Sequence, residues 1–265
     1  MTTAIYLNGA TLMTTPTHRV LEIARETGYV GIEARTERLL EDTGEVRATA
    51  ERVRPKEVLT LNGVALTVQP DGRMDRRLIE DALRPRLQIC QDLGAPYLLA
   101  IPPRAPGLET RRAIPATHDA LELARDRADR MGIRIAFEFL GFGDCPINTP
   151  AIAAETVDGV DGIDLVLDSC HWHASGSQPL TSFPVGRIAL VHLNDAPDKP
   201  PRLIEDEDRL LPGEGVIKLA DLTRELKTRG YAGPWSLDTF NHAYWNDDPQ
   251  SVAQRGLEAV TRSVG

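Results

Sequence analysis

The sequence predicts an α/β protein of the (β/α)8 TIM-barrel class, folded as one domain over residues 1–265. The chain has 265 residues, which is near the typical size of one such barrel and long enough to bury a large core. Short β-branched or aliphatic runs recur along it with amphipathic stretches between them, a pattern typical of helices around a parallel sheet. No stretch has the composition of a linker between domains.

The runs predict eight strands, each short and mostly apolar. In chain order they are Ala4–Asn8, Tyr29–Ala34, Val58–Asn62, Tyr97–Ile101, Ile133–Phe139, Ile163–Asp168, Ile188–Asn194 and Pro234–Thr239. Two proline-rich stretches, 102–115 after the fourth strand and 196–215 after the seventh, are predicted to be loops. Both would lie at the C-terminal face of the barrel, where the active sites of such barrels are built.

The intervening stretches predict helices, with weaker helical signals after the second and sixth strands. The helices expected in chain order are Pro16–Glu26, Arg76–Leu93, Thr110–Met131, Ala151–Val157, Val216–Arg229 and Gln250–Ser263. Four glycines each follow a helical pattern and precede a strand, as a helix-ending glycine in the left-handed conformation does. They are Gly28, Gly94, Gly132 and Gly230.

Composition excludes several function classes. Lys and Arg total 30 against 39 Asp and Glu, and a formal charge of -9 repels nucleic acid. No apolar run approaches the length of a membrane span, and the N-terminal residues lack the features of a secretion signal. The three cysteines have no CxxC spacing, so we expect reduced thiols and a cytoplasmic location.

The last four predicted strands each end with a side chain that can bind a metal. Side chains alternate between the two faces of a strand. The four strand-end side chains should therefore point into the barrel, while neighbours of the other parity, such as Leu165 and Leu167, should point outward to the helices. Three carboxylates and an imidazole suit Mn²⁺, Zn²⁺, Co²⁺ or Mg²⁺ without selecting among them. Burying three carboxylates is costly unless a cation compensates, so the set predicts one divalent metal. The residues are Glu138, Asp168, His192 and Asp238.

Five segments resemble the inosose isomerases, which belong to the xylose isomerase-like sugar isomerases and epimerases. The match runs in order over nearly the whole chain, and the DSxHxHAxGS and DEDRxxPGxG stretches are its specific parts. The segments are NGATL (8–12), GYVGIEART (28–36), IAFEFLGFGDCPINT (135–149), LVLDSCHWHASGS (165–177) and EDEDRLLPGEG (205–215).

The resemblance implies an enzyme that isomerises or epimerises a small polyhydroxylated ketone, a keto-inositol or sugar, by proton transfer through an enediolate. It places the metal ligands on the four strand ends above and acid/base catalysis on Glu138 and Asp238. Two positions depart from the family pattern: Asp238 and Gly9 each occupy a position where the inosose isomerases have glutamate. A carboxylate one methylene shorter reaches about 1.5 Å less far, and a misplacement of ~1 Å costs roughly a hundredfold in rate.

Four further residues are predicted to bind substrate. The resemblance implies that His171, in a DxxH pattern, bonds a substrate hydroxyl and that Arg209, in the DEDR motif, clamps the substrate. Glu33 and Asn62 end the second and third strands, where polar groups can select hydroxyl positions, although anchoring a loop is an equally common role. For His173, a structural role is as common as a functional one.

Two alternatives stay open, and a third is discounted. A dehydratase acting on an inosose or a dehydroshikimate-like substrate would use the same metal. A nuclease of the same fold would need several metals and a basic surface, which the charge of -9 does not offer. A barrel degraded by the Asp238 substitution would bind sugar without turning it over. The expected partner is a small polyol or ketose, with no nucleic acid and no membrane, and a homodimer is allowed.

Overall fold

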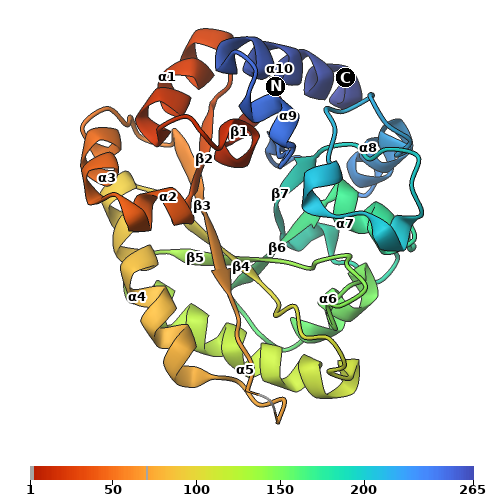
Figure 1. Ribbon diagram of the computed structural model, residues 1–265. Coiled ribbons are helices and arrows are strands. Elements are labelled where there is room, and N and C mark those ends of the chain that lie inside the picture. Colours follow the sequence, from red (N-terminus) through yellow and green to blue (C-terminus); the bar gives the residue numbers. More distant parts are fainter. Residues whose placement is uncertain (1–2, 70) are drawn as a thin grey trace.

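The computed structural model describes residues 3–69 and 71–265. Across these residues, eight parallel strands close into a barrel in the order β1 to β8, with β8 paired to β1. Helices surround this ring (Figure 1), which confirms the predicted fold class. The strands are β1 (Ile5–Asn8), β2 (Gly31–Arg35), β3 (Val58–Ala65), β4 (Tyr97–Ile101), β5 (Arg134–Glu138), β6 (Ile163–Asp168), β7 (Ile188–Leu193) and β8 (Trp235–Leu237).

Long helices form the outer layer, and short ones occupy the loops above the barrel. Glycines with positive φ follow the helices as predicted: φ is 102° at Gly28 and 67° at Gly94. The α-helices are α1 (Thr17–Thr27), α2 (Thr36–Glu41), α3 (Thr43–Ala50), α4 (Arg76–Leu93), α5 (Thr110–Asp129), α6 (Pro150–Thr156), α7 (Ser169–Ala174), α8 (Leu219–Thr228), α9 (His242–Trp245) and α10 (Pro249–Val264). Single 3-10 turns are η1 (Gly9–Leu12), η2 (Val185–Arg187), η3 (Pro201–Leu203) and η4 (Asp206–Asp208).

Several element boundaries differ from the prediction by a few residues. Strand β3 continues to Ala65, and α5 begins at Thr110 as predicted, so the loop after β4 ends before residue 115, the limit that the proline pattern indicated. Helix α8 begins at Leu219 and not at Val216. The backbone N–H of Val216 donates to Ala196 O at 2.9 Å, which holds this residue against the preceding loop and delays the helix.

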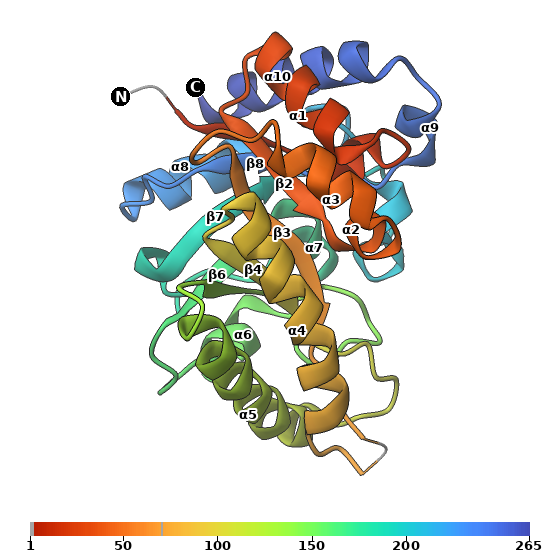
Figure 2. The same ribbon diagram turned by 90° about the vertical axis from the view of Figure 1, so that its left-hand side faces the viewer.

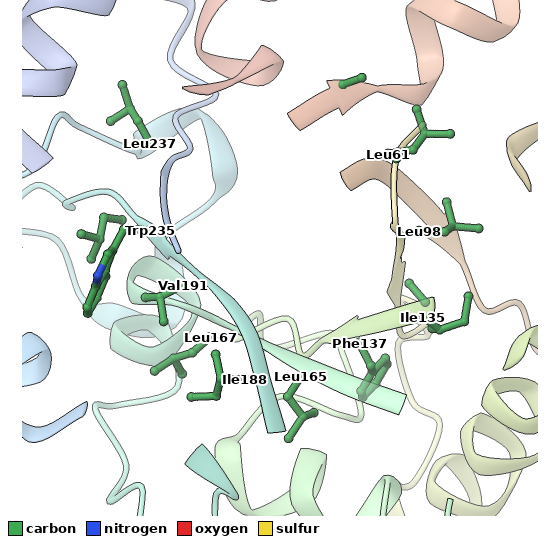
Figure 3. Packing of buried hydrophobic residues seen from close by; sticks show 14 of the residues in the cluster. Leu61, Leu98, Ile135, Phe137, Leu165, Leu167, Ile188, Val191, Trp235 and Leu237 are labelled. Atoms are coloured by element: carbon green, nitrogen blue, oxygen red, sulfur yellow. The ribbon is translucent and has the colours of Figure 1, made fainter. Parts of the chain in front are cut away.

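The buried residues form two layers separated by the strands. Side chains of one parity pack between the strands and the helices, and Figure 3 shows them around the outside of the ring, among them Phe137, Leu165 and Val191. Side chains of the other parity fill the barrel interior as a separate small cluster, namely Leu99, Ala136, Val166 and Leu190. The predicted inward parity of the strand ends is therefore confirmed in β5, β6 and β7.

The ends of the barrel sequence meet on one side of the molecule. Helix α10 packs against α1, α8 and β1, so the first and last elements lie side by side (Figure 2). Cys90, Cys145 and Cys170 are free and buried, as predicted for reduced thiols. No helix in residues 3–69 or 71–265 is long and apolar enough to cross a membrane.

Candidate metal centre and active site

Three of the four predicted metal ligands form one buried group at the C-terminal face of the barrel. Glu138 ends β5, Asp168 ends β6, and His192 lies beside Asp168 in the register of β6 and β7. One ligand atom from each of the three lies within 4.8 Å of the others. Because neighbouring parallel strands place equivalent positions at the same level, residues 54 apart in sequence, such as Glu138 and His192, come into contact.

One nitrogen of the His192 ring faces all the carboxylates of the centre. Its Nδ1 lies 2.8 Å from Glu138 Oε1, and 3.8 Å from Asp168 Oδ2. The fourth predicted ligand, Asp238, is outside the compact group of three, yet its Oδ2 is 3.4 Å from the same nitrogen. The geometry therefore gives three grouped ligand atoms and one adjacent carboxylate.

Arg209 reaches into this cluster from the loop after β7. Its side chain is almost fully buried, and its Nη1 lies 3.1 Å from Asp168 Oδ2 and 2.7 Å from Asp238 Oδ2. Its Nη2 donates to His171 Nε2 at 2.9 Å. An arginine only donates, so Nε2 of His171 is the acceptor, and the ring's Nδ1 carries the proton. The guanidinium thus offsets two buried carboxylates that would otherwise repel each other.

The two buried carboxyl groups that contact Arg209, those of Asp168 and Asp238, have opposite pKa shifts. Burial raises the pKa of Asp238 to about 6, although Arg209 and His192 oppose the rise. Burial also favours the neutral form of Asp168, but there Arg209, His171 and His192 outweigh it and lower the pKa. Burial opposes protonation of His192, yet the surrounding carboxylates, first of all Glu33, raise its pKa well above the usual value. Asp168 is therefore a permanent anion, while Asp238 can exchange a proton near neutral pH.

Asp195, which the sequence analysis did not single out, holds the loop that carries Arg209. Its Oδ1 accepts from the backbone N–H groups of Ala196 and Ile217, and its Oδ2 accepts from Gly213 at 2.9 Å. A Cβ at Gly215 would collide with the carbonyl oxygen of Ala196, so this close approach requires glycine. An acidic residue directly after the predicted seventh strand was the available signal.

A cavity of about 490 Å³ opens beside the acidic cluster. Its walls include several buried polar atoms for which residues 3–69 and 71–265 offer no hydrogen-bond partner. Buried polar groups are nearly always paired, so these atoms indicate a polar ligand. They are Asn62 Nδ2, His171 Nδ1, Arg209 Nε and Asp238 Oδ1.

The cavity wall also contains arginines that no sequence pattern indicated. Arg35 and Arg104 are paired with acidic side chains, Arg35 with Glu37 and Arg104 with Asp144. Arg86, from α4, has no acidic partner within 4 Å in the described part of the chain, and it donates to Gly63 O at 3.0 Å. Arg35 ends β2, Arg86 lies in α4 and Arg104 lies in the loop after β4, and arginine is common on protein surfaces, so these positions carried no signal in the sequence.

Glu33 lies where the sequence analysis did not expect it. The residue is fully buried and is not among those that line the cavity. Its carboxylate faces His192 Nε2 at 3.1 Å. Asn62, the other residue predicted from a strand end, does line the cavity, whereas His173 does not.

Comparison with known proteins gives matches over nearly the whole chain. Residues 21–263 match the model of a family described as xylose isomerase-like TIM barrel. The chain is 30% identical to an inosose isomerase of Bacillus velezensis over 91% of this chain and 90% of that protein. A solved structure of the IOLI protein with a zinc atom superposes with a TM-score of 0.85 at 28% identity, covering 98% of both chains.

A more distant similarity connects the chain to a different reaction. A 3-dehydroshikimate dehydratase of Pseudomonas aeruginosa is 30% identical over 69% of this chain, a match that covers 29% of the dehydratase. The match to the dehydratase therefore covers less than a third of that protein, whereas the match to the inosose isomerase covers most of that protein.

Proposed function

This chain belongs to the xylose isomerase-like TIM barrel family, and on that premise we propose that it isomerises a keto-inositol with the help of one divalent cation. The observation that carries the proposal is the buried group of Glu138, Asp168 and His192 beside a cavity with unpartnered polar atoms. The similarity to inosose isomerases over 91% of the chain supports the reaction and the substrate class.

The residues of the centre fit a divalent cation. Two carboxylate oxygens and one imidazole nitrogen within 4.8 Å form a mixed set that accepts Zn²⁺, Mn²⁺, Co²⁺ or Mg²⁺. Asp238 Oδ1 has no partner in the described residues and is available as a fourth ligand. The zinc of the solved IOLI structure supports zinc among the four. When bound, the cation supplies positive charge that stabilises the oxygen on which negative charge develops.

Two carboxylates are placed to move protons. Glu138 and Asp238 both line the cavity, so a ketone bound there contacts both. One carboxylate removes the C–H proton beside the carbonyl, and the proton of the hydroxyl on that carbon passes to the former carbonyl oxygen. The other carboxylate delivers a proton to the former carbonyl carbon, which leaves an isomeric ketone with no net gain or loss of atoms. A pKa of about 6 lets Asp238 accept and return a proton near neutral pH.

The remaining polar groups of the cavity hold the substrate hydroxyls. His171 donates from Nδ1, and Arg209 donates from Nε, both on the acidic side of the cavity. Asn62 Nδ2 donates from the opposite wall. Three donors at separate positions match the several hydroxyls of a cyclitol.

The first test combines metal content with turnover. We expect elemental analysis of wild-type protein, purified without chelator, to give about one divalent ion per chain, and Glu138→Ala and His192→Ala to lose it. We expect NMR to follow conversion of 2-keto-myo-inositol into an isomer of equal mass by the wild type. Wild-type protein that stays metal-free after reconstitution, or leaves the keto-inositol unchanged, contradicts the proposal.

A dehydratase is the second candidate function. The similarity to a 3-dehydroshikimate dehydratase favours it, as does Arg86, a half-buried cation in the cavity wall that could face a substrate carboxylate. Mass spectrometry separates the two reactions, because a dehydratase product is lighter by one water. If neither reaction occurs and Asp238→Glu restores turnover, the chain is the sugar-binding barrel without catalysis. The homodimer and the cytoplasmic location stay predictions.

A further inference from the structure

Glu33 is a buried carboxylate that neither lines the cavity nor joins the group of metal ligands. It lies in β2, across the barrel from His192 in β7. Its Oε1 and Oε2 are 3.1 and 3.2 Å from His192 Nε2. The other ring nitrogen, Nδ1, faces Glu138. The imidazole therefore spans the barrel between one carboxylate on its Nε2 side and the metal-ligand group on its Nδ1 side.

Neighbouring strands hold the Glu33 carboxylate in place. Glu33 pairs in register with Asn8 of β1 and with Thr60 of β3. Asn8 Nδ2 donates to Oε1 at 3.3 Å, and the Thr60 hydroxyl lies 2.6 Å from Oε2. The same hydroxyl lies 2.6 Å from Asn62 Oδ1, so Glu33 and Asn62 share this one donor. Three strands thus fix both oxygens of Glu33.

A carboxylate at this depth is costly for the fold. The interior positions of the same barrel below it are filled by apolar side chains such as Leu99 and Val166. Apolar packing would serve the core equally well without the desolvation penalty of a buried charge. A role that only filled space would not need this side chain or its three polar partners.

We propose that Glu33 is a positioning residue that accepts the Nε2 proton of His192 and so fixes the tautomer in which Nδ1 offers its lone pair to the cation. This inference rests on the proposed metal centre. A histidine ligand generally donates its other ring N–H to a carboxylate or carbonyl, which orients the ring and makes it more basic. Loss of such a partner typically weakens metal affinity ~10- to 100-fold.

The test measures zinc affinity and the tautomer in two Glu33 variants. Zinc dissociation constants are obtained by competition with a chelator for the wild type, Glu33→Gln and Glu33→Met. We expect a loss of ~10- to 100-fold for Glu33→Met and a smaller loss for Glu33→Gln, whose amide oxygen still accepts from Nε2. Nitrogen-15 spectra of the zinc-loaded wild type should show His192 protonated at Nε2.

A matched control separates positioning from general damage. Glu45 is a second buried glutamate, bonded to Arg38 and Thr17 far from the ligands, so Glu45→Gln should bind zinc like the wild type. Unchanged zinc affinity in folded Glu33→Met and Glu33→Gln, or zinc bound through Nε2, overturns this inference alone. Wild-type protein that binds no zinc overturns both the inference and the proposed function. If Glu33→Met does not fold, the nitrogen-15 spectrum of the zinc-loaded wild type still decides the outcome, because zinc bound through Nε2 is incompatible with a proton on that nitrogen.

Discussion

The two halves of the barrel end differently at the face that carries the cavity. Strands β5 to β8 lead into His192 and the three carboxylates around it, whereas β1, β3 and β4 end with or carry uncharged side chains such as Asn8, Asn62 and Ile101. In the described part of the first half, Glu33 is the acidic group that contacts His192, through Nε2 of the ring. Acidic groups are therefore concentrated on one side of the cavity, and uncharged side chains and arginines lie on the other.

The loop after β7 covers this acidic half. Arg209 contacts two of its carboxylates, and Asp195 fixes the loop through three backbone N–H groups. The opposite wall has Arg35 and Arg86, which do not contact the metal-ligand group. Substitutions in the acidic half should therefore change catalysis, while those in the other half should change substrate binding.

The largest expected effect comes from Asp238→Asn in the acidic half. An amide cannot exchange a proton, so turnover should fall by ~10²- to 10⁴-fold, the usual contribution of a general acid or base. Initial rates with the divalent metal in excess measure this effect without a contribution from weakened metal binding. Asp164→Asn, on β6 at the far end of the barrel and paired with Arg134, is the control and should keep its rate. A variant at 238 with near wild-type turnover would contradict the proton role.

Arg209→Met tests the charge balance of the same half. It removes the buried guanidinium that pairs with both Asp168 and Asp238, so the free energy of unfolding of metal-free protein should fall by ~3–5 kcal/mol. The fall should be smaller in metal-loaded protein, because the cation compensates the same carboxylates. Denaturant unfolding with and without zinc measures both values. Equal losses in the two states would mean that the arginine and the cation do not share these carboxylates.

Asn62→Ala tests the half opposite the acidic groups. The variant loses one donor to a substrate hydroxyl, worth about 1–1.5 kcal/mol, so KM should rise roughly tenfold while kcat stays close to wild type. Steady-state kinetics with 2-keto-myo-inositol measure both constants. A drop in kcat as large as the rise in KM would place Asn62 among the groups that act on the transition state, and the division between the halves would fail.

The smallest effect is expected from Glu45→Gln in the helical layer. Burial favours its neutral form, but Arg38 and Thr17 outweigh it and lower the pKa of Glu45 below 4.5. The stabilisation that ionised Glu45 contributes is therefore complete above its pKa in the unfolded state. It disappears as the pH falls through its lower pKa in the folded state. The variant should lose about 1 kcal/mol at pH 7, and its difference from the wild type should shrink below pH 4.5. Thermal unfolding across pH measures the change, and a difference that grows on acidification would contradict it.

The sequence by itself determined the barrel and the strand ends that carry the candidate metal ligands. Strand and helix periodicities are local, so the βα alternation could be identified without knowledge of contacts. The alternation of side chains within β5, β6 and β7 likewise predicted that Glu138, Asp168 and His192 point inward, since the period of a strand is two residues. The glycine at the end of α1 followed from the same local rules, as its positive φ confirms.

Only the tertiary structure decided which of these groups meet across the barrel. Glu33 and His192 are 159 residues apart, and no local pattern relates them. The same holds for Arg209 against Asp168, and for Arg86 in the cavity wall, because closure of the sheet and the path of a loop set those distances. Periodicity fixes the direction of a side chain from its own strand, whereas its partner depends on how all eight strands close into the barrel.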